Sequence, residues 1–325
     1  MKGWNQPGRG AHSGSNRPLS IKRELVLLLL MGISVFGAIR LMGYAVEYLR
    51  SRRTSREMRY AYLTVTPTPL PTEVPIPTTT PQLDETPLVI VCTPVAATPM
   101  PTAVQSQTPC PYPNNPKLIV NDRFKSLRSI NRDMIGWLHI DHLLDEAVVQ
   151  RNNVFYLDHD VKGEPNSNGA IFLDAMTSLR SRPGALILYG HNMKSGAMFG
   201  SLRNYENADF YHRAPFIQMD TLYEDGEYVV FAVGTISVNS MDAAYVDLYA
   251  IQGWRAEEKE RAIRALQQQS IYQSTIEVLP EDQLLLLVTC VDRADQRRVV
   301  AARRIRDQES KDALTAQVNR SQRRR

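Results

Sequence analysis

Two residues of this sequence combine reactive side chains with a position at the end of an apolar run. Cys290 follows the apolar residues 284–288 and Thr289, and a polar stretch comes after it. His191 follows the apolar residues 185–189 and one glycine. An ordinary thiol is only a few per cent thiolate at neutral pH, so a cysteine nucleophile needs a proton-transfer partner. A lone histidine is more often structural, but its matching position makes His191 the candidate partner.

The position of Cys290 favours a reactive role over a packing role. A run that is apolar on both faces indicates a central strand, and a purely structural cysteine would more naturally lie inside it. Nucleophiles are common where a rigid strand gives way to a loop that admits substrate. Arg297 and Arg298 begin the next strand-like stretch. A guanidinium there would face the thiol across a hairpin and stabilise a developing oxyanion.

Metal and phosphate chemistry fit the sequence less well. His139, Asp141 and His142 form one acidic cluster and residues 158–160 form another, but neither has HExxH or similar metal-binding spacing. We interpret both as solvated loops. The sequence also lacks a phosphate-binding loop, a GxSxG elbow and a dinucleotide fingerprint. We therefore expect an enzyme without metal or cofactor.

The residues that must position Cys290 and His191 are organised as short strands. Turn signals such as Pro183-Gly184 and Asp225-Gly226 separate the apolar runs, a pattern typical of an all-β sandwich or barrel. Helical spacing predicts one helix at residues 121–131 and a second, inserted helix at residues 253–269. The strands are expected at residues 135–140, 147–150, 169–173, 185–190, 227–233, 284–290 and 297–305.

The first part of the sequence predicts a membrane anchor. Residues 25–39 are uncharged and apolar, and a mixed continuation reaches residue 49. A cleaved signal peptide is the main alternative, but no small-residue cleavage site comes after this run. We expect a cytoplasmic tail at residues 1–23 and a transmembrane helix at residues 24–49. Basic residues flank both sides almost equally, so the cytoplasmic N-terminus rests on the extracellular character of the proline-rich segment beyond residue 49.

Between this anchor and the body lies that proline-rich segment. Of the 20 prolines, 14 lie between Pro67 and Pro116. Such a composition favours extended polyproline II, so residues 50–116 are predicted to be a disordered extracellular stalk. Cys92 and Cys110 fall within it, either paired or free. Residues 117–306 are then the catalytic domain and residues 307–325 a basic tail. The net charge of +4 is concentrated in the flanks, which argues against nucleic-acid binding.

Several segments, in order, resemble the sortases, and class B sortases in particular. They are INRDMIGWLHI from Ile130, NGAIFLD from Asn168, YGHNMKSGAMFGSL from Tyr189, Thr289-Cys290, and RRVV from Arg297. The resemblance implies an eight-stranded β-barrel with a long helix before the cysteine strand, where residues 253–269 lie. It assigns catalytic roles to His191, Cys290 and Arg297, with Arg297 preferred over Arg298 because one residue separates it from the valine pair. Asp292 matches an acidic position without an assigned role.

The same resemblance implies a cysteine transpeptidase. Such an enzyme cleaves a C-terminal sorting signal of a surface protein, forms a thioacyl intermediate and transfers it to an amine of a cell-wall precursor or a pilin. A peptidase releasing free acid, a pilin-polymerising sortase and a non-catalytic surface module remain alternatives. Leu286 and Val288 depart from the family pattern, and we expect both to influence the choice of sorting signal through substrate contacts.

Overall fold

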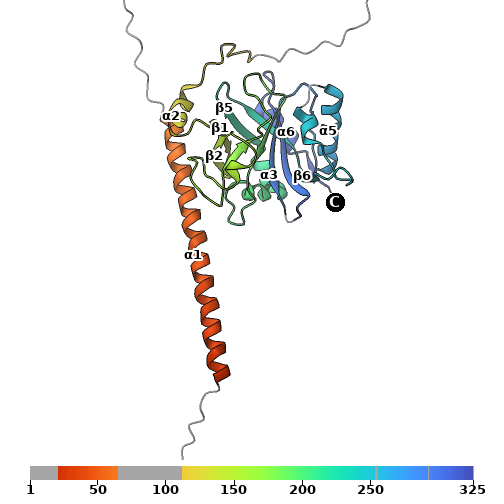
Figure 1. The fold of residues 1–325 in the computed structure, drawn as a ribbon. Coiled ribbons are helices and arrows are strands. Elements are labelled where there is room, and N and C mark those ends of the chain that lie inside the picture. Colours follow the sequence, from red (N-terminus) through yellow and green to blue (C-terminus); the bar gives the residue numbers. More distant parts are fainter. Residues whose placement is uncertain (1–20, 65–111, 253–254, 292, 325) are drawn as a thin grey trace, which may run out of the picture. The chain divides into compact units, whose positions relative to one another are not determined.

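The computed structural model describes residues 21–64, 112–252, 255–291 and 293–324. The chain divides into two compact units, Met1–Arg50 and Ser51–Arg325. The strands and helices of the second unit can be followed in Figure 1. Cys92, Cys110 and Asp292 lie outside the described residues, as does most of the proline-rich segment.

The first unit contains the start of helix α1 (Ile21–Leu63). Its apolar side chains, from Leu25 to Leu49, are largely exposed. The stretch Leu25–Leu63 contains a window of mean hydropathy 2.4 and is long and apolar enough to cross a membrane. A signal sequence has the same properties, so length and composition alone do not separate the two.

The second unit is built on a closed barrel, which confirms the predicted fold class. Around the barrel the described strands follow the order β1-β2-β3-β4-β8-β9-β6-β5. Pairing is parallel between β2 and β3 and between β4 and β8, and antiparallel elsewhere in the barrel. The strands are β1 (Met134–Ile140), β2 (Leu144–Val149), β3 (Ile171–Leu173), β4 (Ala185–Tyr189), β5 (Phe216–Thr221), β6 (Glu227–Ser237), β8 (Leu284–Cys290) and β9 (Gln296–Arg304). The short strands β7 (Tyr272–Gln273) and β10 (Gln322–Arg323) form a separate pair.

Strand β8 is central, as its continuous apolar run predicts. It lies between β4 and β9, and its residues from Leu284 to Thr289 are all buried. Strand β5, in contrast, is not among the strands that the sequence predicts. It reads FIQMDT, and its polar Asp220 is fully buried because Tyr62 and Arg123 bind that carboxylate. Because Gln218 and Asp220 are polar, the sequence of β5 lacks the apolar run by which the other strands are predicted.

Helices surround the barrel. They are α2 (Asp122–Ile130), η1 (Phe155–Leu157), η2 (Phe199–Glu206), α3 (Ala208–Arg213), α4 (Leu248–Gln252), α5 (Ala256–Gln269) and α6 (Lys311–Val318). The helix predicted at residues 121–131 is confirmed as α2, where the Asn121 side chain accepts a hydrogen bond from the main-chain N–H of Arg123. The inserted helix is confirmed as α5, which buries Ala262, Ile263 and Leu266.

A buried lysine attaches α5 to the barrel. Lys259 donates from Nζ to the carbonyl oxygens of Gly184 at 3.1 Å and Asp282 at 2.6 Å. These two residues shortly precede the paired strands β4 and β8. Burial lowers the pKa of the Lys259 ammonium to about 8. The helix is therefore fixed against the two strands that carry the candidate site.

The stalk does not begin at residue 50. Helix α1 continues to Leu63, and Ser51–Leu63 belongs to the unit that contains the barrel. Met58 and Tyr62 are buried in the barrel's hydrophobic cluster, and the Tyr62 ring stacks on Trp137 with centroids 4.6 Å apart. Apolar burial and aromatic stacking hold this segment on the barrel.

The expected basic tail is also structured in part. Residues 311–318 form α6, which buries Leu314 and Val318, and β10 pairs with β7. Buried Arg303 binds Glu309 through two hydrogen bonds of 2.6 Å, which fixes the start of this region. The prediction of a basic tail rests on the arginines at residues 320–325, and these say nothing about the fold of the residues before them.

Candidate active site

The candidate histidine and cysteine follow neighbouring parallel strands. Tyr189 on β4 lies opposite Val288 on β8, and the Gly190 N–H donates to the Val288 carbonyl at 3.4 Å. The Thr289 hydroxyl donates to the Gly190 carbonyl at 2.6 Å. Because parallel strands end at the same edge of a sheet, His191 follows β4 at the edge where Cys290 ends β8. The structure thus brings the two predicted residues to one edge of the barrel.

Cys290 itself is a free, exposed cysteine. Its neighbour Thr289 is buried and donates to the main chain just after β4. This bond holds the end of β8 in place while the thiol of Cys290 remains accessible. Accessibility is a requirement for a nucleophile that must meet a peptide carbonyl.

Strand register separates the two candidate arginines. Cys290 lies opposite Arg297, and Thr289 lies opposite Arg298. Directly opposed residues of an antiparallel pair project from the same face, so Arg297 shares the face of Cys290 and Arg298 lies on the other face. There Arg298 donates to Glu206 at 2.6 and 3.0 Å. The Arg297 Nη1 donates to the carbonyls of Ala294 at 2.7 Å and Gln296 at 2.8 Å, within its own hairpin.

His191 is half-buried and is held by the main chain of another loop. Its Nε2 lies 2.6 Å from the carbonyl oxygen of Leu157, at the end of η1. No sequence pattern identifies such a contact, since any residue type provides a carbonyl. Gly169, which lies close to both groups, is conspicuous in the sequence only as part of an Asn-Gly pair.

Leu286 and Val288, which were expected to contact substrate, are buried. Both side chains are buried in the barrel, with exposed fractions of 0% and 1%. The expectation that they contact substrate is therefore not met in this structure. Any influence on substrate choice would have to act through the packing of β8.

The two acidic clusters of the sequence are held by local contacts. The His139 Nε2 lies 3.0 Å from Asp141 and its Nδ1 lies 3.3 Å from Asp145, whereas His159 bonds to Asp158 at 2.6 Å. In the part of the chain that the structure describes, no group of three or more His, Cys, Asp or Glu side chains is arranged to hold a metal ion.

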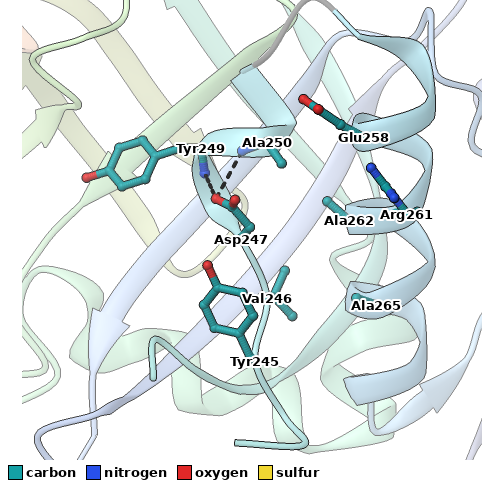
Figure 2. A pocket seen from close by; sticks show the side chains of 9 residues that line it. All are labelled: Tyr245, Val246, Asp247, Tyr249, Ala250, Glu258, Arg261, Ala262 and Ala265. Atoms are coloured by element: carbon teal, nitrogen blue, oxygen red, sulfur yellow. Dashed lines mark hydrogen bonds between the residues drawn. The ribbon is translucent and has the colours of Figure 1, made fainter. Parts of the chain in front are cut away.

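A hollow of about 510 Å³ lies apart from the three candidate residues (Figure 2). It is bounded by α4 and the loop before it on one side and by α5 on the other, with Asp247 and Glu258 among its lining residues. Asp247 accepts hydrogen bonds from the N–H groups of Tyr249 and Ala250, so it serves to start α4. Neither Cys290 nor His191 lines this hollow.

Residues 138–305 match the sortase domain, and this chain belongs to the sortase family, whose members are cysteine transpeptidases. The sortase B of Listeria monocytogenes is 33% identical over 180 residues, which cover 54% of this chain and 70% of that protein. The sortase B of Staphylococcus aureus is 28% identical over 192 residues, covering 57% and 75% respectively. The resemblance to class B sortases is thereby confirmed.

Solved structures of sortase B have the same fold as the barrel unit. Sortase B from B. anthracis in complex with AAEK1 is similar with a TM-score of 0.57 and 25% identity, over 80% of this chain and 99% of that chain. The Staphylococcus aureus sortase B–substrate complex is similar with a TM-score of 0.51 and 26% identity, over 58% and 87%.

Proposed function

We propose that this chain cleaves the C-terminal sorting signal of surface proteins and transfers them to a cell-wall amine, with Cys290, His191 and Arg297 as its catalytic residues. The observation that carries the proposal is the pairing of β4, β8 and β9. It brings His191 and Cys290 to one edge of the barrel and sets Arg297 opposite Cys290.

The proposed reaction proceeds through two acyl transfers. The Cys290 thiolate attacks the carbonyl carbon of the scissile peptide bond, and the resulting oxyanion is stabilised by Arg297 and main-chain N–H groups. His191 donates a proton to the departing amine, which leaves a thioester between Cys290 and the surface protein. An acceptor amine then attacks this thioester and loses a proton to His191, forming the new amide and restoring the thiolate.

The geometry of Arg297 is compatible with this role. Its hydrogen bonds to Ala294 and Gln296 involve Nη1 alone and hold the guanidinium on the β8–β9 hairpin. Among the described residues, Nε and Nη2 have no protein acceptor, so they remain available to an oxyanion. Arg298, in contrast, is bound to Glu206 on the opposite face.

The test uses a fluorogenic peptide that carries a sorting signal. Cys290→Ala is expected to abolish cleavage, because no other group in the site can form the thioester. Cys290→Ala turnover at the wild-type rate would disprove the assignment. His191→Ala is expected to reduce kcat by at least a hundredfold, whereas His142→Ala, an exposed histidine in the turn between β1 and β2, serves as the matched control.

Product analysis separates transfer from hydrolysis. With an added amine such as a short peptide bearing a free N-terminus, a transpeptidase gives the amide, whereas a peptidase gives free acid regardless of the amine. The same assay with a lysine side-chain amine tests the pilin alternative. Predominant acid at saturating amine would favour the peptidase.

The apolar part of α1 supports a further component of the proposal: a single-pass membrane anchor with a cytoplasmic N-terminus and an extracellular catalytic unit. A cell-wall acceptor requires the catalytic unit to lie outside the membrane. Protease added to intact cells should digest the barrel unit and spare an N-terminal epitope. Recovery of a soluble protein lacking residues 1–49 would instead indicate a cleaved signal sequence.

A further inference from the structure

The contact between His191 and Leu157 determines which ring nitrogen carries a hydrogen. A main-chain carbonyl can only accept a hydrogen bond, so the Nε2 that lies 2.6 Å from the Leu157 oxygen must be the donor. In neutral imidazole the other nitrogen, Nδ1, then has the free lone pair. We infer that the Leu157 carbonyl is the positioning group of His191 and that Nδ1 exchanges protons with the thiol and the leaving amine. This inference rests on the catalytic role proposed for His191.

The Leu157 carbonyl is itself held in place by hydrogen bonds that close its short helix. The Asn152 side chain accepts hydrogen bonds from the N–H groups of Val154 at 3.0 Å and Phe155 at 2.7 Å. The Leu157 N–H donates to the Val154 carbonyl at 3.0 Å. These bonds close η1 into a tight turn whose last carbonyl meets the histidine.

The residue before Leu157 fixes the turn to the core. Tyr156 is buried, and its hydroxyl donates to Asp133 at 2.8 Å and accepts from Asn131 at 2.8 Å. Its main-chain carbonyl accepts from the Ala170 N–H at 2.9 Å, which ties η1 to the start of β3. The carbonyl that meets His191 is therefore a preorganised group and not a passing loop contact.

Gly169 makes the approach of these groups sterically possible. It adopts φ +62°, and a Cβ at this position would lie 2.9 Å from the Leu157 oxygen and 3.1 Å from the Cδ2 of His191. It would also lie 2.5 Å from the Tyr156 oxygen. Any side chain here would have to displace the carbonyl or the imidazole ring, so glycine is required by both backbone conformation and space.

The nearest acidic side chain in the sequence does not take this role. Asp158 follows Leu157, but its carboxylate bonds to the Nδ1 of His159 at 2.6 Å. In cysteine–histidine enzymes the base is usually oriented by a third group. In the described residues of this chain the group found at that place is a neutral main-chain carbonyl.

The first test is the tautomer of His191 in the wild-type enzyme. Nitrogen NMR of protein labelled with ¹⁵N-histidine, assigned by comparison with His191→Gln, should show the Nε2–H tautomer for the neutral ring. A neutral ring protonated at Nδ1 would overturn the inference. This spectrum does not depend on turnover, so it can succeed or fail independently of the proposed catalytic role.

The second test compares two glycines. Gly163 also has positive φ, +83°, but no atom lies within 4 Å of its Cβ position, so Gly163→Ala reproduces the backbone strain without the clash. Gly169→Ala is expected to lower kcat at least tenfold with KM changed less than threefold, to shift the pH profile of kcat and to give mixed tautomers. Gly163→Ala should stay within twofold of wild type in kcat.

Equal kcat values and equal His191 spectra in the two variants would overturn the inference. If Gly169→Ala does not fold, the wild-type tautomer still decides. If the wild-type ring has the Nε2–H tautomer but His191→Ala keeps full cleavage activity, the contact is real and the proposed catalytic role is wrong.

Discussion

The side chains of Cys290 and Arg297 share one face of the β8–β9 hairpin, and those of Thr289 and Arg298 share the other. This alternation places two adjacent arginines in different surroundings. Arg297 lies on the face of the thiol and bonds to carbonyls of its own hairpin, whereas Arg298 forms an ion pair with Glu206, where its side chain is only 16% exposed.

Alanine substitution should separate the catalytic role proposed for Arg297 from the structural role of Arg298. Arg297→Ala is expected to lower kcat by about a hundredfold, because loss of one oxyanion donor has an effect of that order. Arg298→Ala should keep kcat within a few-fold of wild type and cost about 1 kcal/mol of stability through the lost ion pair. Steady-state kinetics and thermal unfolding of both variants provide the measurement. A larger kinetic defect in Arg298→Ala would show that the wrong arginine has been assigned.

For single residues, the sequence predicts which side chains are candidates for the site, but it does not predict which main-chain groups contact them. The ends of two apolar runs suggest Cys290 and His191 as candidates, and the matching family segments around them strengthen that prediction. The choice between Arg297 and Arg298 needs either the family pattern or the register of β8 against β9, and neither follows from periodicity. The Leu157 carbonyl could not be predicted, because its position depends on how η1 folds against β3.

The end of α1 is the element whose role differs most from expectation. Its residues Ser51–Leu63 are mainly charged and polar, so their composition predicts part of the stalk. In the structure Tyr62 stacks on Trp137, and its hydroxyl donates to the buried Asp220 at 2.5 Å. Arg59 also pairs with Asp145 at 2.7 Å. Residues Ser51–Leu63 contain few apolar side chains, yet they pack on the barrel because an aromatic stack and an ion pair add to the burial of Met58 and Tyr62.

Two tyrosines on this helix provide a matched comparison. Tyr62 is 5% exposed and Tyr60 is 71% exposed. Tyr62→Ala is expected to destabilise the barrel unit by about 3 kcal/mol, since it removes a buried aromatic ring. It also leaves Asp220 with one partner fewer. Tyr60→Ala should change stability by less than about 0.5 kcal/mol. Chemical denaturation of both variants measures the difference, and equal destabilisation would mean that the helix is not docked in solution.

The same docking surface contains a carboxyl group that should make stability depend on pH. Burial raises the pKa of Glu146 from 4.5 to about 7, opposed by its hydrogen bonds from Ser55 and reinforced by the charge of Asp145. The folded state therefore binds more protons than the unfolded state between these two values. Stability associated with Glu146 is present below about pH 4.5 and is lost as the pH rises to about 7.

Glu146→Gln should remove this loss. The amide oxygen still accepts from Ser55 but does not ionise. Between pH 5 and pH 8 the variant is expected to gain about 2.5 kcal/mol of stability relative to wild type, because one unit of pKa corresponds to about 1.4 kcal/mol and most of the shift is titrated in this range. Thermal unfolding at both pH values is the measurement, with Glu257→Gln on the exposed side of α5 as control. A constant difference between the two pH values would exclude the titration of Glu146 as its cause.

Across the whole molecule, the proline-rich segment is bounded on both sides by residues of one unit. Leu63 ends the docked helix on one side. On the other side Tyr112 is buried and its hydroxyl donates to the Leu179 carbonyl at 3.1 Å. The sequence predicts a spacer because composition shows where a chain cannot pack, but it does not show where the two ends of such a segment attach.

Shortening this segment should therefore have little effect on the enzyme. Deletion of residues 71–100 is expected to change stability by about 1 kcal/mol or less, because loop-closure entropy varies only slowly with length. Peptide cleavage should be unchanged. Unfolding and kinetics of the deletion variant provide the measurement, and loss of the folded barrel would show that the segment contributes to the core.

The two fixed ends also determine what happens if a protease cuts between them. A cut in an ordinary tether would release the catalytic unit from everything that precedes it. Here a cut within residues 65–111 would leave two fragments, one ending after the docked helix and the other containing the complete barrel. Met58 and Tyr62 lie in the barrel's hydrophobic cluster, so the fragments would remain bound to each other without a covalent link. After such a cut the barrel would stay attached to the docked end of α1.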